Sequence, residues 1–418
     1  MKPRLSSYIC SAAAVSALFL GTADAATWSF TSVKSSFNSL PPAVGNGTAD
    51  DTAAINRAIA NGTSIYFPPG TYRYVGVLTV PANTAYRFYG DGPGISKILF
   101  NTASTGINAP NRGSQPLQIE GLTIVAGTAN CGTAISAAFD PAIGKYRSAT
   151  IRNVEIAPSD RSLSPTGYWV NGISLYQAPN ALIEDVQVHG KFDFSQGGTS
   201  APIAEVGISW FSSADHPTTQ LFLHNTYVEY FKVGVQTSGW VEGFYMSGFE
   251  LVFCGSSTRG AMELTGATYP NGGKVPTFYL SNGHVNQITE GIRMTNLVGV
   301  KISHVNFLNQ LGNGTHLSVT NCTDASITDS DFFDYGSLGE NQSNGIYLFS
   351  TTAGATTGTK ISGNTFSNMT QSQGGSCVVV QANCRRVQIL DNDFGNSPSH
   401  INNMAGNNAF IRETPPFP

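Results

Sequence analysis

The chain has 418 residues, of which only 11% are charged, and its formal net charge at pH 7 is −4. This balance argues against nucleic acid as a partner, and it provides no strong field that would attract a densely anionic polymer. We therefore expect a partner that is neutral or only mildly acidic.

Residues 1–25 have the pattern of a secretory signal peptide. A basic start precedes an apolar stretch from Tyr8 to Leu20, and small residues up to Ala25 offer a cleavage site. No later apolar run is long enough to cross a membrane. The sequence thus predicts a secreted protein, extracellular or periplasmic, without a membrane span.

The cysteines beyond the signal peptide are odd in number: Cys131, Cys254, Cys322, Cys377 and Cys384. At least one thiol should stay free unless two chains pair. Cys377 and Cys384 are close in sequence, and either a disulfide or two small buried thiols fits this spacing. No spacing of Cys and His is typical of a zinc site, so we expect no metal centre of that kind.

A helix is predicted near the start of the mature chain. Thr48 or Asp50 can cap it, apolar residues recur on one face between residues 54 and 59, and Asn61-Gly62 ends it. The next apolar segment, residues 65–67, is expected to form the first strand, followed by a turn at Pro68-Pro69-Gly70.

Most of the remaining chain repeats a short phrase in which an aliphatic residue is followed by small polar residues and, at the fifth step, by another apolar residue. The phrase starts at Ile119, Ile151, Ile183, Leu223, Met246, Leu280, Ile302, Ile327, Ile361 and Ile389. A second phrase, similar to G-I-x-L, precedes most copies at a mean spacing of about 29 residues, which is typical of stacked repeats.

These phrases predict an all-β fold, because they are too short for helices and alternate apolar with polar residues. Two or three short strands per coil, with about 10 coils, describe a parallel β-helix whose neighbouring coils bury a common core. We expect the cap and first coils at 26–100, the β-helix at 101–395 and a C-terminal tail at 396–418. A β-propeller or sandwich is the alternative, but propeller blades are usually longer and carry four strands.

The N-terminal segment also carries a family resemblance. It contains Gly-x-Gly-x-x-Asp-Asp-Thr-x-Ala-Ile at residues 45–55, Ile-Tyr-Phe-Pro-Pro-Gly-x-Tyr at 65–72, and Gly90-Asp91-Gly92. This pattern resembles the pectate-lyase-like superfamily, which includes rhamnogalacturonase-type and tailspike-type proteins. The resemblance implies a single-stranded, right-handed parallel β-helix with an N-terminal capping helix. It implies no single reaction, since members hydrolyse, eliminate or epimerise polysaccharides and some only bind them.

Stacking turns every repeated position into a column, because adjacent coils lie about 4.8 Å apart. Two and four residues after the anchor, three neighbouring coils carry the pairs Asn282 with His284, His304 with Asn306, and Asp329 with Asp331. If the local backbone is extended, both members of each pair face the same way. We therefore expect these side chains to form one outward patch.

The patch offers two carboxylates and two imidazoles, which are groups suited to acid and base catalysis on a glycosidic bond. We expect Asp329 and Asp331 to supply the acid and the base or nucleophile, with His284 and His304 tuning their pKa values and binding hydroxyls. Glu250 stands three coils, or about 14 Å, from Asp331, which is too far for both to act on one bond. The alternative is a purely structural polar column, whose side chains only form hydrogen bonds with backbone groups of the next coil.

Substrate binding is expected from residues beside this patch: Tyr245, Tyr279, Lys301, Asn282, Asn306 and Glu250. Aromatic rings in a row can contact sugar faces, and Lys301 can meet a hydroxyl or carboxylate. We expect three further acids, Glu155, Glu229 and Asp334, to be solvated.

The sequence therefore favours a secreted polysaccharide-degrading enzyme, with a glycoside hydrolase preferred. One alternative is a lyase that acts by β-elimination on a uronate-containing glycan. A cofactor is expected only for this alternative, namely calcium bound by Asp329, Asp331 and Asp334. The other alternative is a carbohydrate-binding surface protein without catalysis. The sugar and the oligomeric state are left open.

Overall fold

We describe the fold from a computed structural model. The structure describes residues 29–412, with gaps at 38, 141–145, 163, 194–200, 214, 269–272, 310–313, 335–342, 370–374, 396, 398 and 407–408. The predicted signal peptide lies outside the described residues. Within them, no helix is long and apolar enough to span a membrane.

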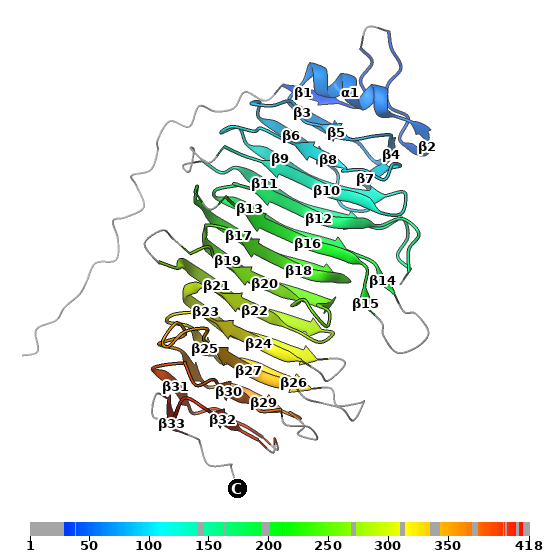
Figure 1. The fold of residues 1–418 in the computed structure, drawn as a ribbon. Helices are drawn as coiled ribbons and strands as arrows, with labels where there is room; N and C mark the ends of the chain where they lie inside the picture. Colours follow the sequence, from blue (N-terminus) through cyan, green and yellow to red (C-terminus); the bar gives the residue numbers. More distant parts are fainter. Residues whose placement is uncertain are drawn as a thin grey trace, which may run out of the picture.

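Two long parallel sheets run side by side along the whole stack, so the chain is a parallel β-helix, as predicted (Figure 1). The larger sheet contains β1 (Phe30–Ser32), β2 (Asn46–Asp50), β3 (Ser64–Phe67), β4 (Gly70–Tyr74), β6 (Tyr86–Gly90), β7 (Ser96–Phe100), β9 (Leu117–Ala126), β11 (Ala149–Ala157), β13 (Ala181–His189), β17 (Thr218–Glu229), β19 (Val241–Cys254), β21 (Val275–Gln287), β23 (Leu297–Asn309), β25 (Ser326–Thr328), β26 (Asp331–Asp334), β28 (Lys360–Ser362), β29 (Thr365–Ser367), β31 (Val387–Leu390) and β33 (Ala409–Arg412). The smaller sheet contains β5 (Leu78–Thr79), β8 (Ile107–Ala109), β10 (Cys131–Ala138), β12 (Trp169–Tyr176), β16 (Ala204–Phe211), β18 (Phe231–Ser238), β20 (Met262–Thr265), β22 (Ile292–Thr295), β24 (Thr315–Thr320), β27 (Asn344–Phe349), β30 (Val378–Val380) and β32 (Ile401–Asn403). A separate antiparallel pair is formed by β14 (Phe192–Asp193) and β15 (Ala201–Pro202).

Helix α1 (Thr52–Asn61) lies at the N-terminal end of the stack (Figure 1). Its buried residues are Ala54, Ile55, Ala58 and Ile59, the apolar face that the sequence indicated. The N-cap residue is Asp51, however, and its carboxylate accepts hydrogen bonds from the backbone N–H groups of Val44 and Gly45 at 2.6 and 3.1 Å. Asp51 thus connects the preceding segment to the start of the helix. That α1 closes the open end of the stack remains a prediction. At the other end, β32 and β33 continue both sheets within the segment that we expected to be a tail.

The repeated phrase bends sharply at its third residue. This position has a left-handed backbone in coil after coil, with φ of 52° at Asn282, 55° at His304 and 50° at Asp329. Asn, Asp and Gly adopt this conformation more readily than other residues, which explains why they recur there. The assumption that the phrase is one extended strand is therefore wrong at this position: β25 ends at Thr328 and β26 begins at Asp331.

Inside the stack, side chains from successive coils lie directly on one another. The rings of Phe307 and Phe332 are parallel at a centroid distance of 4.6 Å, and Phe366 continues the row at 4.9 Å from Phe332. Beside them runs a buried polar row. The Asn364 amide donates to Ile327 O at 3.0 Å and to Asn392 Oδ1 at 3.0 Å, and its Oδ1 accepts from the Ser330 N–H at 3.1 Å. We had considered a polar ladder at the second residue after each anchor, the position of Asp329. The ladder is instead found at the third residue, where Ser330, Asn364 and Asn392 face inward.

All five cysteines of the described residues are free and buried, so Cys377 and Cys384 do not form the disulfide that their spacing allowed. Burial raises the pKa of the Cys377 thiol to about 12 and that of Cys384 to about 11. These thiols therefore behave as small apolar core groups.

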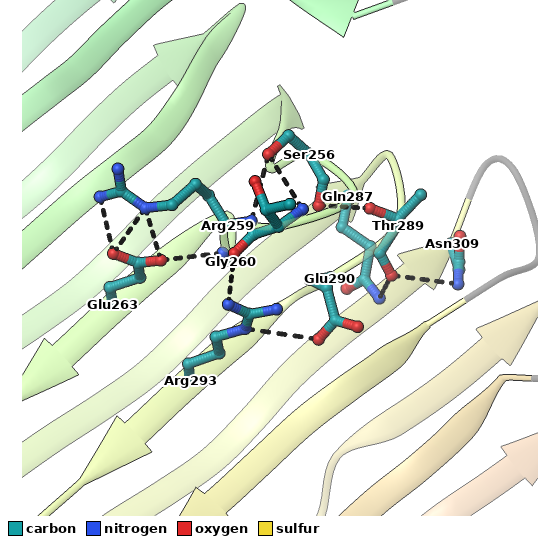
Figure 2. Close-up of polar contacts among 10 residues, drawn as sticks. Ser256, Arg259, Gly260, Glu263, Gln287, Thr289, Glu290, Arg293 and Asn309 are labelled. Carbon is teal, nitrogen blue, oxygen red and sulfur yellow. Dashed lines mark hydrogen bonds and ion pairs between the residues drawn. The ribbon is translucent and has the colours of Figure 1, made fainter. Parts of the chain in front are cut away.

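A network of paired charges connects neighbouring coils on the smaller sheet (Figure 2). Arg259 holds the Glu263 carboxylate through Nε at 2.9 Å and Nη2 at 2.8 Å, while Arg293 Nε lies 3.5 Å from Glu290. Glu263 and Arg293 are register partners on β20 and β22, and each forms its ion pair within its own coil. The two coils are connected by the hydrogen bond that Arg293 Nη1 donates to Thr258 O at 2.6 Å. Burial is the main reason why the pKa of Glu290 is raised, with Arg293 opposing the shift.

The inward polar row gives a test of the fold. Asn364→Ala should destabilise the protein by about 1–3 kcal/mol for each buried group left unpaired, including the Ser330 N–H. Chemical unfolding monitored by circular dichroism measures this change. Lys360→Ala, an exposed position on β28, is the matched control and should leave the unfolding midpoint nearly unchanged. Equal midpoints for both variants would contradict the inferred role of the row.

Glu290 gives a second test, of pH dependence. Its pKa is raised in the folded state, so the folded protein holds this proton more tightly than the unfolded chain. The contribution of Glu290 to stability is therefore present at low pH and is lost as the pH rises above the ordinary glutamate value of 4.5. Unfolding midpoints of the wild type and Glu290→Gln, measured between that pH and neutrality, should diverge in favour of the variant as pH rises. A difference that does not vary with pH would contradict this.

Candidate functional site

The strand register confirms that one outward column runs along the larger sheet. Tyr227 pairs with Glu250, Glu250 with His284, His284 with Asn306, and Asn306 with Asp331. These residues come from β17, β19, β21, β23 and β26, which are consecutive coils in this sheet. The column therefore brings together residues that are up to about a hundred positions apart in the sequence.

A depression of about 630 Å³ opens on this face of the larger sheet. It is lined by Gly248, Phe249, Glu250, Asn282, Gly283, His284, His304 and Asn306. Within it, His284 Nδ1 lies 3.4 Å from Glu250 Oε1, and both side chains remain partly exposed, at 35% and 48%. We call this depression the groove. It combines a carboxylate, two imidazoles and two amides, which can bind hydroxyl groups and exchange protons.

The structure places the sequence-predicted catalytic residues in two sets. His284 and His304 line the groove, together with Asn282, Asn306 and Glu250. Asp329 and Asp331 belong to the following coil and are exposed, and neither is among the residues that line the groove. Because Asp329 occupies the left-handed bend, the prediction that it and Asp331 share one extended strand is wrong.

The predicted row of Tyr245, Tyr279 and Lys301 is present in the register, and Phe222 on the preceding coil extends it. The rings of Phe222 and Tyr245 are stacked at a centroid distance of 5.0 Å with an angle of 10° between them. Stacked rings cover each other's faces. Tyr279 is turned by 71° relative to Tyr245, and Lys301 Nζ lies 4.9 Å from the centroid of the Tyr279 ring. Tyr279 is thus the ring of this row that is engaged by a cation.

Sequence reasoning missed a half-buried cluster on the N-terminal side of the groove, formed by Glu155, His189, Tyr227 and Glu229. His189 Nδ1 lies 2.7 Å from Glu229 Oε1, and the Tyr227 hydroxyl donates to Glu229 Oε2 at 2.7 Å. On the other side, His189 Nε2 lies 3.8 Å from Glu155 Oε1. Glu155 also accepts hydrogen bonds from Thr123 and Arg161. We call these four residues the Tyr227 cluster.

The Tyr227 cluster is next to the groove, because Tyr227 pairs in register with Glu250 and is influenced by the charge of Glu250. Burial, the hydrogen bond to Glu229 and the charges of Glu229 and Glu250 all raise the pKa of Tyr227, so the phenol stays protonated. The Tyr227 hydroxyl therefore lies in the negative potential of both the Glu229 and the Glu250 carboxylates. The signal that could have located this cluster was the repeat itself, which places His189 and Glu229 in register two positions after the column.

The expectation that Glu155, Glu229 and Asp334 are solvated is wrong. Glu155 is 4% exposed and Asp334 is fully buried, while the Glu229 side chain is 16% exposed. Asp334 Oδ1 lies 3.1 Å from His316 Nε2, and the Ser343 hydroxyl donates to its other oxygen. Buried carboxylates need such partners, since an unpaired charge in the interior is costly. Among the residues that the structure describes, no group of three or more His, Cys, Asp or Glu is placed to hold a metal ion.

Comparison with known proteins identifies the family. Residues 42–255, just over half of the chain, match the model of the rhamnogalacturonase A/epimerase, pectate lyase-like family. The chain belongs to this family. No curated protein matches its sequence.

Solved structures share the fold at low sequence identity. The A-module of mannuronan C-5 epimerase AlgE4 from Azotobacter vinelandii superposes with a TM-score of 0.65 and 18% identity, covering 92% of this chain and 100% of that one. DFA-IIIase from Arthrobacter chlorophenolicus A6 gives 0.56 and 14%, covering 90% and 97%. Tailspike protein 2 of Escherichia coli O157:H7 bacteriophage CAB120 gives 0.53 and 12%, covering 77% and 41%. At these identities the likeness establishes the parallel β-helix.

Proposed function

We propose that this protein is an enzyme that binds a polysaccharide along the larger sheet and hydrolyses its glycosidic bonds in the groove. The observation that carries the proposal is the groove itself, in which the Glu250 carboxylate and the His284 imidazole meet at 3.4 Å among the side chains of Asn282, His304 and Asn306. Carboxylates and imidazoles can give and take the protons that cleavage of a glycosidic bond requires.

A polymeric substrate is favoured by the shape of the site. The column of polar side chains continues from Tyr227 to Asp331 across five coils, so a linear chain can lie along it and contact several residues in turn. Amide and imidazole groups can hydrogen-bond to neutral sugar hydroxyls, in keeping with the low net charge. Membership of the family, and relatives in fold named for mannuronan epimerisation and for a phage tailspike, support a polysaccharide.

Two sets of carboxylates can supply the acid and the base. The first is the sequence-predicted pair Asp329 and Asp331, beside the C-terminal end of the groove. The second is Glu250 together with the acids of the Tyr227 cluster, at the N-terminal end. Lys301, one of the residues that could act as the base in elimination, lies over the Tyr279 ring and does not line the groove. Hydrolysis is therefore the reaction that we favour.

Export belongs to the same proposal. Residues 1–25 have the composition of a signal peptide, and a polysaccharide is a substrate that is degraded outside the cytoplasm because of its size. The mature enzyme would then act in the extracellular medium or the periplasm.

The test of function is product analysis with purified mature protein on a panel of neutral and uronate-containing polysaccharides. We expect new reducing ends without the ultraviolet absorbance of an unsaturated uronate. Glu250→Gln should lower kcat by about 10²–10⁴-fold, because it removes a proton-transferring group. Glu184→Gln, a surface position paired with Arg152 at 2.7 Å, is the matched control and should keep full activity.

Other products would replace this proposal with a defined alternative. Absorbance of an unsaturated uronate would mean β-elimination. Exchange of sugar C–H hydrogen with solvent, without chain cleavage, would mean epimerisation. Binding without any chemical change would mean a non-catalytic carbohydrate-binding protein.

A further inference from the structure

We propose that Gly248 is the specificity-determining residue of the groove, because it leaves one coil without a side chain at the bend and so makes a subsite for a single, unbranched sugar unit. This inference rests on the proposed function, since it takes the ligand to be a polysaccharide. Its basis is the line of residues that occupy the left-handed bends of successive coils, which we call the bend column.

Gly248 interrupts the bend column. The strand register places it between Asn225 on the preceding coil and Asn282 on the following one, and His304 comes next. All four have a left-handed backbone, with φ of 48° at Asn225, 61° at Gly248, 52° at Asn282 and 55° at His304. Adjacent coils are about 4.8 Å apart, so the backbones of the two asparagines are separated by about 9.6 Å with no side chain between them. The bend column therefore has a gap that is one coil high.

The gap has an acceptor oxygen on one side and opens into the groove on the other. The three atoms nearest to a Cβ added at Gly248 all belong to Asn225, and the closest is Oδ1 at 2.6 Å. Asn225 Nδ2 donates to Asp185 Oδ1 at 3.1 Å, which fixes the amide with its oxygen toward Gly248. On the opposite side, Gly248 and Asn282 both line the groove. An Asn side chain at position 248 would therefore project into the groove.

A second glycine gives the groove an apolar floor. Gly283 on β21 pairs in register with Phe249 on β19, and both line the groove. A Cβ added at Gly283 would lie 2.2 Å from two atoms of the Phe249 ring, so the ring occupies the place of the missing side chain. Phe249 is 3% exposed, and that remaining surface belongs to the groove. The floor is thus part of an aromatic ring, and the walls are amides.

This combination suits a neutral sugar unit. A sugar ring has an apolar C–H face, which can contact the Phe249 ring, and hydroxyl groups around its rim, which amide groups of Asn225 and Asn282 can bind. A branch directed along the stack would meet one of these two asparagines, so the subsite selects an unbranched unit. Glu250 and His284 line the same groove, and a unit held at Gly248 therefore lies beside the groups that can exchange protons.

The experiment fills the gap with the residue that the chain itself uses on both sides of it. Asn accepts the left-handed backbone, so Gly248→Asn should fold, and only the end of the Asn225 side chain has to move. The probes are polysaccharides that share a backbone and differ in single-sugar branches, namely linear mannan with galactomannan and linear xylan with arabinoxylan. Gly248→Asn should weaken binding of the linear probe that the wild type binds by about 10–100-fold, because contacts of one sugar unit are lost. Gly248→Ala should cause a smaller loss. Isothermal titration calorimetry measures both.

Two control variants separate the groove from the backbone. Gly299→Asn lies on β23 outside the residues that line the groove, has φ of 66°, and an added Cβ there meets nothing within 4 Å. It should keep the dissociation constant within about twofold of the wild type. Gly363→Asn reproduces the crowding at Gly248, since its φ is 69° and an added Cβ meets Asp329 Oδ1 at 2.8 Å. Its unfolding midpoint should match that of Gly248→Asn.

Asn282→Gly tests the selection against branches. It extends the gap by one coil, so it should raise the affinity for the branched probe relative to the linear one with the same backbone. Wild-type affinity of Gly248→Asn for the linear probe, or an unchanged preference in Asn282→Gly, would overturn the subsite while leaving hydrolysis in place. Binding without cleavage by the wild type would overturn hydrolysis and leave the subsite. Absence of binding to every polysaccharide would overturn both.

Discussion

Hydrogen bonding between identical positions of successive coils is the constraint from which this structure follows. Each strand of the larger sheet pairs with its neighbours in parallel register, so a residue type that recurs in the sequence becomes a continuous line in space. Inside the stack the result is a row of phenylalanine rings and a row of asparagine amides. Outside, the same register assembles the groove from residues of separate coils. Core and site therefore have one geometric origin.

The fold could be predicted from the sequence because its signal is repeated many times. A single Ile-x-x-x-x-Val phrase is ambiguous, but ten copies fix the column that contains Glu250, His284, Asn306 and Asp331, and the strand register agrees. The sequence did not reveal the left-handed bend at Asn282, His304 and Asp329. That bend depends on how coils turn their corners, and alternation of apolar and polar residues does not report it.

The electrostatic environment of the site was harder to predict than its position. Glu229 and Glu155 appeared to be ordinary surface acids, because the sequence does not show which side chains meet across coils. The structure gives Glu229 two close partners, His189 and Tyr227, one of which comes from a preceding coil. The aromatic row shows the same difficulty. Its members lie where the repeat placed them, yet whether a ring shows its face or its edge depends on rotamers that only the packed structure determines.

Strand length varies along the stack, and this variation bears on how the groove holds its form. Strands β17, β19, β21 and β23 have 12 to 14 residues each, whereas β25, β26, β28 and β29 have only three or four. The groove is built on the long strands, where longer runs of paired residues join each coil to the next, and local opening of the backbone is least favourable there. A ligand that enters this region meets a surface that is already ordered, so little of its binding free energy is spent on immobilising the protein.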